Sequence, residues 1–199
     1  MSSARRSRAK MLEETREKLI STARVAFATQ GFLNTSMEDF TAKIGLTRGA
    51  VYHHFGNKEG LFIAVIEQIE AEVNETLKEV SESASTPWES FHLCCNTYLK
   101  LSLEPDIRRI ILQDARSIFG DVPRASQELS VAALQSSLDI MIAGGVITDL
   151  PSNVLARMIY GAITEASFWI AEQDADYELH LSQALKGLES LLKGLLIRN

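Results

Sequence analysis

A short stretch in the first third of the chain gathers residues that can bind both phosphate and the edges of bases: Thr47, Arg48, Gly49, Tyr52, His53 and Lys58. Arginine can donate two parallel hydrogen bonds to guanine, threonine offers a hydroxyl and a methyl group, and tyrosine and histidine can bind phosphate oxygens. Glycine lets a backbone approach closely, and lysine near a helix N-terminus adds charge where N–H groups already favour phosphate. These residue types predict contacts with DNA.

Local signals just before this stretch predict a first short helix. Ser36 can accept a hydrogen bond from an N–H group of the first turn while Asp39 reaches back, which is the reciprocal pattern of a capping box. The helix should begin at Met37, and Gly45 follows it where a left-handed residue commonly ends a helix. We therefore expect a helix of about two turns.

A second short helix should follow, with Thr47 as its N-cap and Gly56 at its end. Val51 and Phe55 lie four residues apart, so they give that helix one buried edge and leave its polar residues exposed. Tyr52 could also be a core aromatic, although we expect that role for Phe55. A short helix, a glycine-containing turn and a second short helix predict a helix-turn-helix, whose second helix lies in the DNA major groove.

Residues 46–62, LTRGAVYHHFGNKEGLF, resemble the signature of the tetracycline-repressor (TetR) family of bacterial transcription regulators. The specific part is the framework Tyr-x-x-Phe-x-x-Lys-x-x-Leu, because a two-helix pattern alone is a weak signal. With GF and TSM upstream, the resemblance covers roughly residues 15–65. It adds Thr35 and Ser36 to the candidate DNA contacts.

The resemblance implies an all-α fold, with an N-terminal three-helix DNA-binding domain and a larger helical C-terminal domain for ligand binding and dimerisation. We expect residues 1–11 to form a disordered basic arm, residues 12–60 the first domain and residues 61–199 the second. The arm is either a solubilising tail or a flanking contact to phosphate or the minor groove. Phe40 and Thr41 stand where the family usually has a smaller aliphatic residue and alanine, so the two helices should pack differently.

Composition and charge agree with an all-α, DNA-binding protein. The 199 residues are 46% hydrophobic and 23% charged, with four prolines, and no strand-like alternation stands out. Residues 1–60 contain ten Lys and Arg against six Asp and Glu, a net charge of +4, and since the chain total is −6 the remainder has −10. Phosphate binding depends on local charge, so this asymmetry predicts a DNA-binding N-terminal part.

We expect a cytoplasmic protein without a membrane segment. The longest uncharged run, residues 25–37, has 13 residues, which is too short to span a bilayer. The N-terminal arginines precede no apolar region, so no signal peptide is predicted. Cys94 and Cys95 are adjacent and poorly placed to form a structural bridge, which agrees with a reducing compartment.

Hydrophobic periodicity and cap signals predict the remaining helices. Thr15 can cap a first helix that Gly31 ends. Asn57 can cap a long helix to about residue 83, which should connect the two domains, and Thr86 can cap the helix after it. Such a shared helix could transmit a shift of the second domain to the first. Further helices are expected at residues 87–103, from 105 to about 118, up to about 143, at 152–172 and at 176–197.

The last two helices are the predicted homodimer interface. The helix over residues 176–197 has a leucine stripe broader than one neighbour needs, and Gly161 in the helix before it allows close approach. In the TetR family the corresponding pair forms a four-helix interface with a second subunit. The alternative is that both helices pack only within their own chain.

The resemblance also implies an inducer cavity, but no motif identifies its residues. Asp114 and Glu165 are carboxylates at positions of apolar stripes, and a buried carboxylate needs a partner. We favour structural ion pairs, for which the candidate partners are Arg108, Arg116, Arg157 and His92. The alternative is a cavity for an aromatic or cationic ligand, lined by Glu165, Trp169, Tyr98 and His92. Cys95, one turn from His92, is a further candidate ligand-binding residue. These two residues alone do not predict a metal site, because no second pair of metal ligands accompanies them.

These patterns predict a dimeric repressor of nearby genes, released from a palindromic operator by a small-molecule inducer, with no cofactor and no enzymatic activity. The alternative is an all-α enzyme or small-molecule-binding protein whose N-terminal helices are structural. Its four histidines are scattered, and no glycine-rich phosphate loop or assembled nucleophile and base is present in the sequence. A DNA-bound regulator with a filled core and no ligand is a third possibility.

Overall fold

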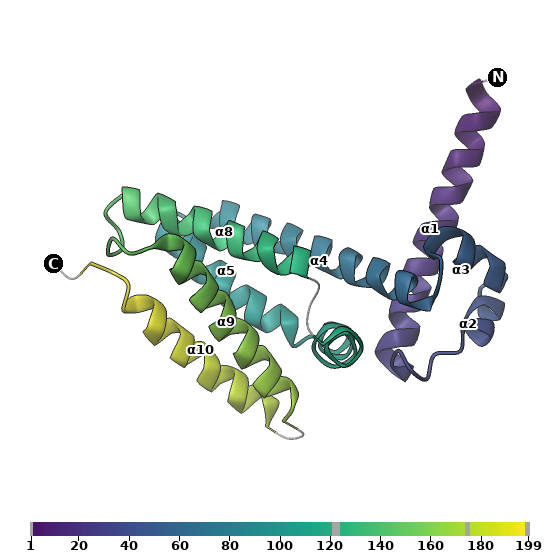
Figure 1. Cartoon of the computed structure of the whole chain (residues 1–199). Coiled ribbons are helices and arrows are strands. Elements are labelled where there is room, and N and C mark those ends of the chain that lie inside the picture. Colours follow the sequence, from purple (N-terminus) through teal and green to yellow (C-terminus); the bar gives the residue numbers. More distant parts are fainter. Residues whose placement is uncertain (1, 121–123, 174–175, 198–199) are drawn as a thin grey trace. The chain divides into compact units, whose positions relative to one another are not determined.

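The computed structural model describes residues 2–120, 124–173 and 176–197 of the chain (Figure 1). Within these ranges every regular secondary-structure element is a helix, and one isolated antiparallel bridge joins Ile147 to Leu196. The all-α prediction is therefore confirmed. The chain divides into two compact units, Met1–Ala71 and Glu72–Asn199. The division falls inside a helix, later than the boundary predicted near residue 60.

The first unit consists of α1 (Ser2–Gln30), α2 (Met37–Lys43), α3 (Arg48–Phe55) and the beginning of α4 (Lys58–Ser83). Its core is built around Phe27, Phe32 and Phe62, whose ring centroids lie between 4.8 and 5.7 Å apart. Contacts between aromatic rings at this separation stabilise the fold beyond what burial of their apolar surface contributes. Val51 of α3 is 1% exposed and packs against the core, as predicted. Phe55, the other residue of the predicted edge, is only half-buried, and the Arg16 guanidinium lies 5.6 Å from the centroid of its ring.

The helix α1 begins earlier than the sequence analysis expected. Residues 2–11 are helical in the structure, which corrects the prediction of a disordered arm. Alanine, arginine, lysine and leucine favour helix, and no glycine or proline interrupts them between Ser2 and Gln30. Thr15 is therefore an interior residue instead of the predicted cap, and its hydroxyl donates to Met11 O at 2.8 Å.

Three of the predicted N-caps form side-chain hydrogen bonds. Ser36 Oγ accepts from Asp39 N at 3.3 Å, Asn57 Oδ1 from Gly60 N at 2.7 Å, and Thr86 Oγ1 from Glu89 N at 3.1 Å. Thr47 holds the expected N-cap position of α3, but its side chain makes no capping bond. Its hydroxyl is thus not used by the helix terminus.

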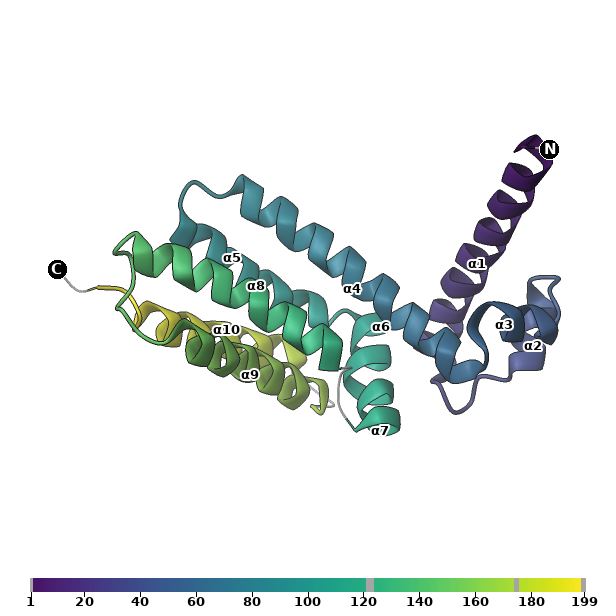
Figure 2. The same cartoon turned by 45° about the horizontal axis from the view of Figure 1, so that its top comes forward.

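The second unit contains the rest of α4, then α5 (Pro87–Ser102), α6 (Pro105–Ile107), η1 (Arg108–Ala115), α7 (Arg116–Phe119), α8 (Arg124–Ala143), α9 (Ser152–Ala171) and α10 (Tyr177–Lys193). Helices α5, α8, α9 and α10 pack into a bundle (Figure 2), in which α9 contacts both α8 and α10. Leu99, Leu138, Met141 and Leu192, each at most 1% exposed, are among the residues of its core.

The helix predicted from residue 105 to about 118 is present with an altered backbone. Its middle part, η1, is a π-helix, in which hydrogen bonds run from i to i+5. Ile110 and Ala115, five residues apart, are both completely buried, whereas Asp114 is half-buried. The wider turn moves Asp114 away from the fully buried face on which α-helical spacing had placed it.

Candidate nucleic-acid interface

The exposed face of α3 presents the polar residues that the sequence analysis singled out. Thr47, Arg48, Gly49, Tyr52 and His53 are all exposed, and Tyr52 keeps 49% of its surface. Since Val51 is buried, the helix has one apolar edge and one polar side. A polar side at the N-terminal end of a short helix is the geometry by which recognition helices contact base edges.

Arg48 and Tyr52 contact each other on this face. The Arg48 Nη2 group donates to the Tyr52 hydroxyl oxygen at 2.9 Å, and the guanidinium carbon lies 5.4 Å from the ring centroid. Residues four apart on a helix are neighbours, which explains the pairing. The pair leaves other guanidinium N–H groups available to a ligand.

Two histidines near the end of α3 have different environments. His53 is exposed, while His54 is half-buried, and their rings lie edge to face with centroids 5.4 Å apart. Burial first, and then the neighbouring His53 and Arg16, lower the pKa of His54 below its ordinary value of 6.5. Of the two, only His53 is placed as a candidate phosphate contact.

Lys58 begins α4, and its side chain contacts the loop between α1 and α2. Its ammonium donates to Leu33 O at 3.4 Å and lies 4.5 Å from the centroid of the Phe32 ring. Burial lowers the pKa of Lys58 from its ordinary value of 10.5. An ammonium group has three donors, so this structural contact leaves others for phosphate.

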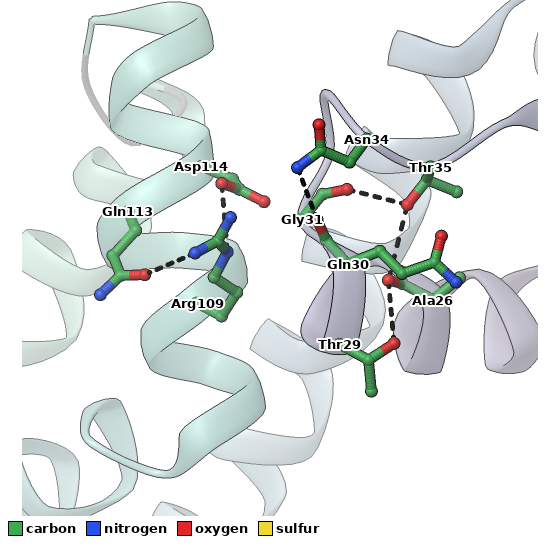
Figure 3. Close-up of polar contacts among 9 residues, drawn as sticks. All are labelled: Ala26, Thr29, Gln30, Gly31, Asn34, Thr35, Arg109, Gln113 and Asp114. Atoms are coloured by element: carbon green, nitrogen blue, oxygen red, sulfur yellow. Dashed lines mark hydrogen bonds and ion pairs between the residues drawn. The ribbon is translucent and has the colours of Figure 1, made fainter.

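Thr35 is part of the core of the first unit and has no exposed face for DNA. It is 3% exposed, and its hydroxyl donates to Gly31 O at 2.8 Å and contacts Ala26 O at 3.5 Å (Figure 3). This hydroxyl stabilises the turn after α1, which corrects its selection as a DNA contact. Ser36 is exposed, with its oxygen used as the cap of α2.

Two residues that the sequence analysis did not select help to position the two short helices, Gly60 for α3 and Lys18 for α2. A methyl group on Gly60 would lie 2.0 Å from Phe55 O, so only glycine allows the turn from α3 into α4. Lys18 of α1 donates to Ile44 O at 3.1 Å and so binds the end of α2. The signal for Gly60 was available, because glycine is disfavoured in helices and needs a reason there.

The residues predicted to line a ligand cavity are dispersed in the second unit. His92 stacks on Trp88 at 6.3 Å between centroids, whereas Trp169 lies edge to face with His180 at 5.0 Å and keeps 41% of its surface. Glu165 is exposed, and Tyr98 is half-buried. The geometry thus gives no support to one cavity that all of these would line.

The other two predicted ligand residues, Asp114 and Cys95, have structural roles: Asp114 forms an ion pair and Cys95 is part of the core. Asp114 Oδ1 lies 3.4 Å from Arg109 Nε, and Arg109 Nη1 donates to Gln113 at 3.4 Å (Figure 3). The favoured ion pair of Asp114 thus forms with Arg109, an arginine that the sequence analysis had not named. Cys95 is 3% exposed, and burial raises the pKa of its thiol to about 12.

Two hollows of the second unit are large enough for small molecules. The larger, of about 440 Å³, is lined by Leu112, Gln113, Arg116, Ser117, Phe168, Ala171 and Glu172. The other, of about 310 Å³, lies between α5 and α10 and is lined by Asn96, Lys100, Glu178, Leu181, Ser182, Leu185, Lys186 and Glu189. None of the six predicted ligand residues lines either hollow.

Comparisons with known proteins agree with this division of the chain. The family described as "Bacterial regulatory proteins, tetR family" matches residues 19–65, and "Tetracyclin repressor-like, C-terminal domain" matches residues 88–195. A crystal structure of a TetR-family transcriptional regulator from Pectobacterium atrosepticum has a TM-score of 0.87 and 46% identity, covering 95% of this chain and 97% of that one.

Curated relatives match in the same way. The HTH-type transcriptional repressor AcnR of Corynebacterium efficiens is 35% identical over 163 residues, which are 76% of this chain and 85% of the relative. The HTH-type transcriptional regulator TtgR of Pseudomonas putida is 38% identical over 71 residues, 36% of this chain and 33% of that protein. The fold and the exposed face of α3 are those of a DNA-binding transcriptional regulator. The chain belongs to the TetR family of bacterial regulatory proteins.

Proposed function

We propose that this chain acts as a homodimeric repressor that binds an inverted-repeat operator through α3. The observation that carries the proposal is the exposed side of this helix, where Arg48, Tyr52 and His53 gather opposite the buried Val51. Lys58, at the start of α4, would add a phosphate contact beside a helix N-terminus. The repressor named AcnR, which matches most of the chain, supports repression as the outcome.

The proposed dimer interface consists of the exposed faces of α9 and α10. Large apolar side chains on these helices keep much of their surface: Val154 50%, Met158 66%, Trp169 41%, Leu179 54% and Leu191 66%. Exposed apolar residues gathered in this way mark an interaction surface. A second copy could cover them with the same faces, and the resulting two-fold symmetry would require inverted half-sites in the operator.

Release from the operator by a small molecule completes the proposal. The hollow of about 440 Å³ beside Arg116 and Phe168 is the candidate site, since the Arg116 guanidinium lies 4.3 Å from the centroid of that ring. A ligand bound there would release DNA only if it bound the DNA-free conformation more tightly.

No helix of the described residues is long and apolar enough to cross a membrane.

The direct test is binding of the purified protein to fragments from upstream of its own gene, at two salt concentrations. We expect one fragment to be bound with an affinity that falls steeply with salt, and a footprint covering an inverted repeat. Arg48→Ala should weaken this binding by roughly tenfold or more, as expected for the loss of one base contact. Lys78→Ala, which removes a side chain of 62% exposure in the second unit, is the matched control. Equal binding by both variants would contradict the assignment of α3.

A further inference from the structure

The Arg48–Tyr52 pair is organised before any DNA is bound. The hydrogen bond of 2.9 Å and the position of the guanidinium 5.4 Å from the ring centroid fix the arginine along the tyrosine side chain. Within the described residues no carboxylate pairs with Arg48, so its charge is not neutralised by the protein. An exposed arginine otherwise has many rotamers, and ordering it on binding costs affinity.

The direction of this hydrogen bond determines what each group can still do. Guanidinium is only a donor, so the Tyr52 oxygen must accept, and the phenol proton stays available. That proton can be donated to a phosphate oxygen. The guanidinium, which has five N–H groups, keeps enough of them for both acceptors of guanine, O6 and N7.

We infer that Tyr52 is a positioning residue for base recognition: by accepting from Arg48 and donating to a phosphate, it couples the backbone contact to the reading of one G·C pair per half-site. The inference rests on the proposed function, because it assigns the specificity of that same surface. Arg48 is the first residue of α3, and the N-terminal residues of a recognition helix contact base edges. A phosphate contact made through Tyr52 would therefore orient the guanidinium that lies one turn before it.

This coupling differs from two independent contacts. If Tyr52 only bound phosphate, its loss would weaken binding to all sequences equally, since phosphate contacts carry no sequence information. If it also positions Arg48, its loss must reduce discrimination at the base pair that Arg48 contacts. The effects of losing Arg48 and Tyr52 would then overlap instead of multiplying.

The test is selection of binding sites from a randomised double-stranded DNA library by the full-length protein and by Arg48→Ala, Tyr52→Phe and the double variant. For each protein we would then measure dissociation constants for the selected site and for the same site with its G·C pair replaced. Tyr52→Phe keeps the ring and removes only the hydroxyl. Tyr177→Phe makes the same change on a tyrosine of similar exposure, 45% against 49%, in the second unit.

We expect the wild type to select a G·C pair at one position of each half-site and Arg48→Ala to lose that preference. Tyr52→Phe should reduce the preference at the same position by about 3- to 10-fold, the range for losing the pre-ordering of one long side chain. Because the Tyr52 hydroxyl also donates to a phosphate, the double variant should bind the selected site more weakly than Arg48→Ala, but by a smaller factor than Tyr52→Phe weakens the wild type. Tyr177→Phe should keep the wild-type preference.

Different outcomes would overturn different statements. A Tyr52→Phe protein that binds all sites more weakly but keeps its preference for G·C would leave Tyr52 as a phosphate contact only, and so would losses that multiply in the double variant. If Tyr52→Phe kept both the wild-type affinity and the wild-type preference for G·C, Tyr52 would have no part in the DNA interface. If the wild type selected no sequence, the proposed function would fail first, and this inference with it.

Discussion

Replacing Gly60 by alanine should displace α3 from α4, because the two helices meet through the backbone at this residue. Gly60 is the third residue of α4, and its N–H donates to Asn57 Oδ1 at 2.7 Å. The added methyl group would lie 2.0 Å from Phe55 O, a backbone atom of the last residue of α3. No side-chain rotation can relieve a contact with a carbonyl oxygen.

The size of the effect follows from how far the backbone must move. Side-chain carbons essentially never approach other heavy atoms closer than 3.0 Å, so the two helices must separate by about 1 Å at this point. Overpacking of this kind costs about 1–3 kcal/mol, from which roughly 0.5–1 kcal/mol is recovered because alanine favours helix over glycine. A net loss of about 0.5–2 kcal/mol corresponds to a fall in Tm of about 1–8 °C for a chain of this length.

Thermal denaturation and DNA binding of Gly60→Ala would measure both consequences. The matched control is Gly49→Ala in α3, where the nearest heavy atom to the new methyl group, Thr47 Oγ1, is at an ordinary 3.5 Å. We expect the control to melt at or above the wild-type temperature. A Gly60→Ala protein that melts with this control and binds the operator with wild-type affinity would refute the reasoning.

Three further substitutions or conditions test other parts of the molecule. Met158→Glu should raise the dimer dissociation constant by about tenfold or more in sedimentation experiments, because it would bury a charge in the proposed interface; Met11→Glu, at 64% exposure against 66% for Met158, should not. The pKa of His54 is lowered in the folded protein, so below pH 6.5 the unfolded chain binds the proton more readily and the free energy of unfolding should fall with falling pH. Denaturant titrations at several pH values would measure this, and the free energy of unfolding of His54→Gln should depend less on pH. Cys95, whose pKa is raised to about 12, should react with a thiol reagent at pH 8 only after unfolding; rapid reaction of Cys94→Ser in the native state would contradict this.

Sequence alone determined the features that depend on residues within one or two helical turns. The capping bonds of Ser36 and Asn57, the ends of α2 and α3 at Gly45 and Gly56, and the polar face of α3 all follow from such spacings. The same is true of the lengths of α5 and α9, which differ from prediction by one residue. Local hydrogen bonds and helical periodicity need no knowledge of the rest of the chain.

Tertiary structure decided how these elements use their side chains. Thr35 is buried because its loop folds back on α1, and Lys58 contacts a carbonyl 25 residues away. In the second unit, the π-helical turn, in place of α-helical spacing, set the position of Asp114, and packing of α5 buried Cys95. Burial, desolvation and the choice of ionic partner depend on segments far apart in the chain, and no spacing within one segment can specify them.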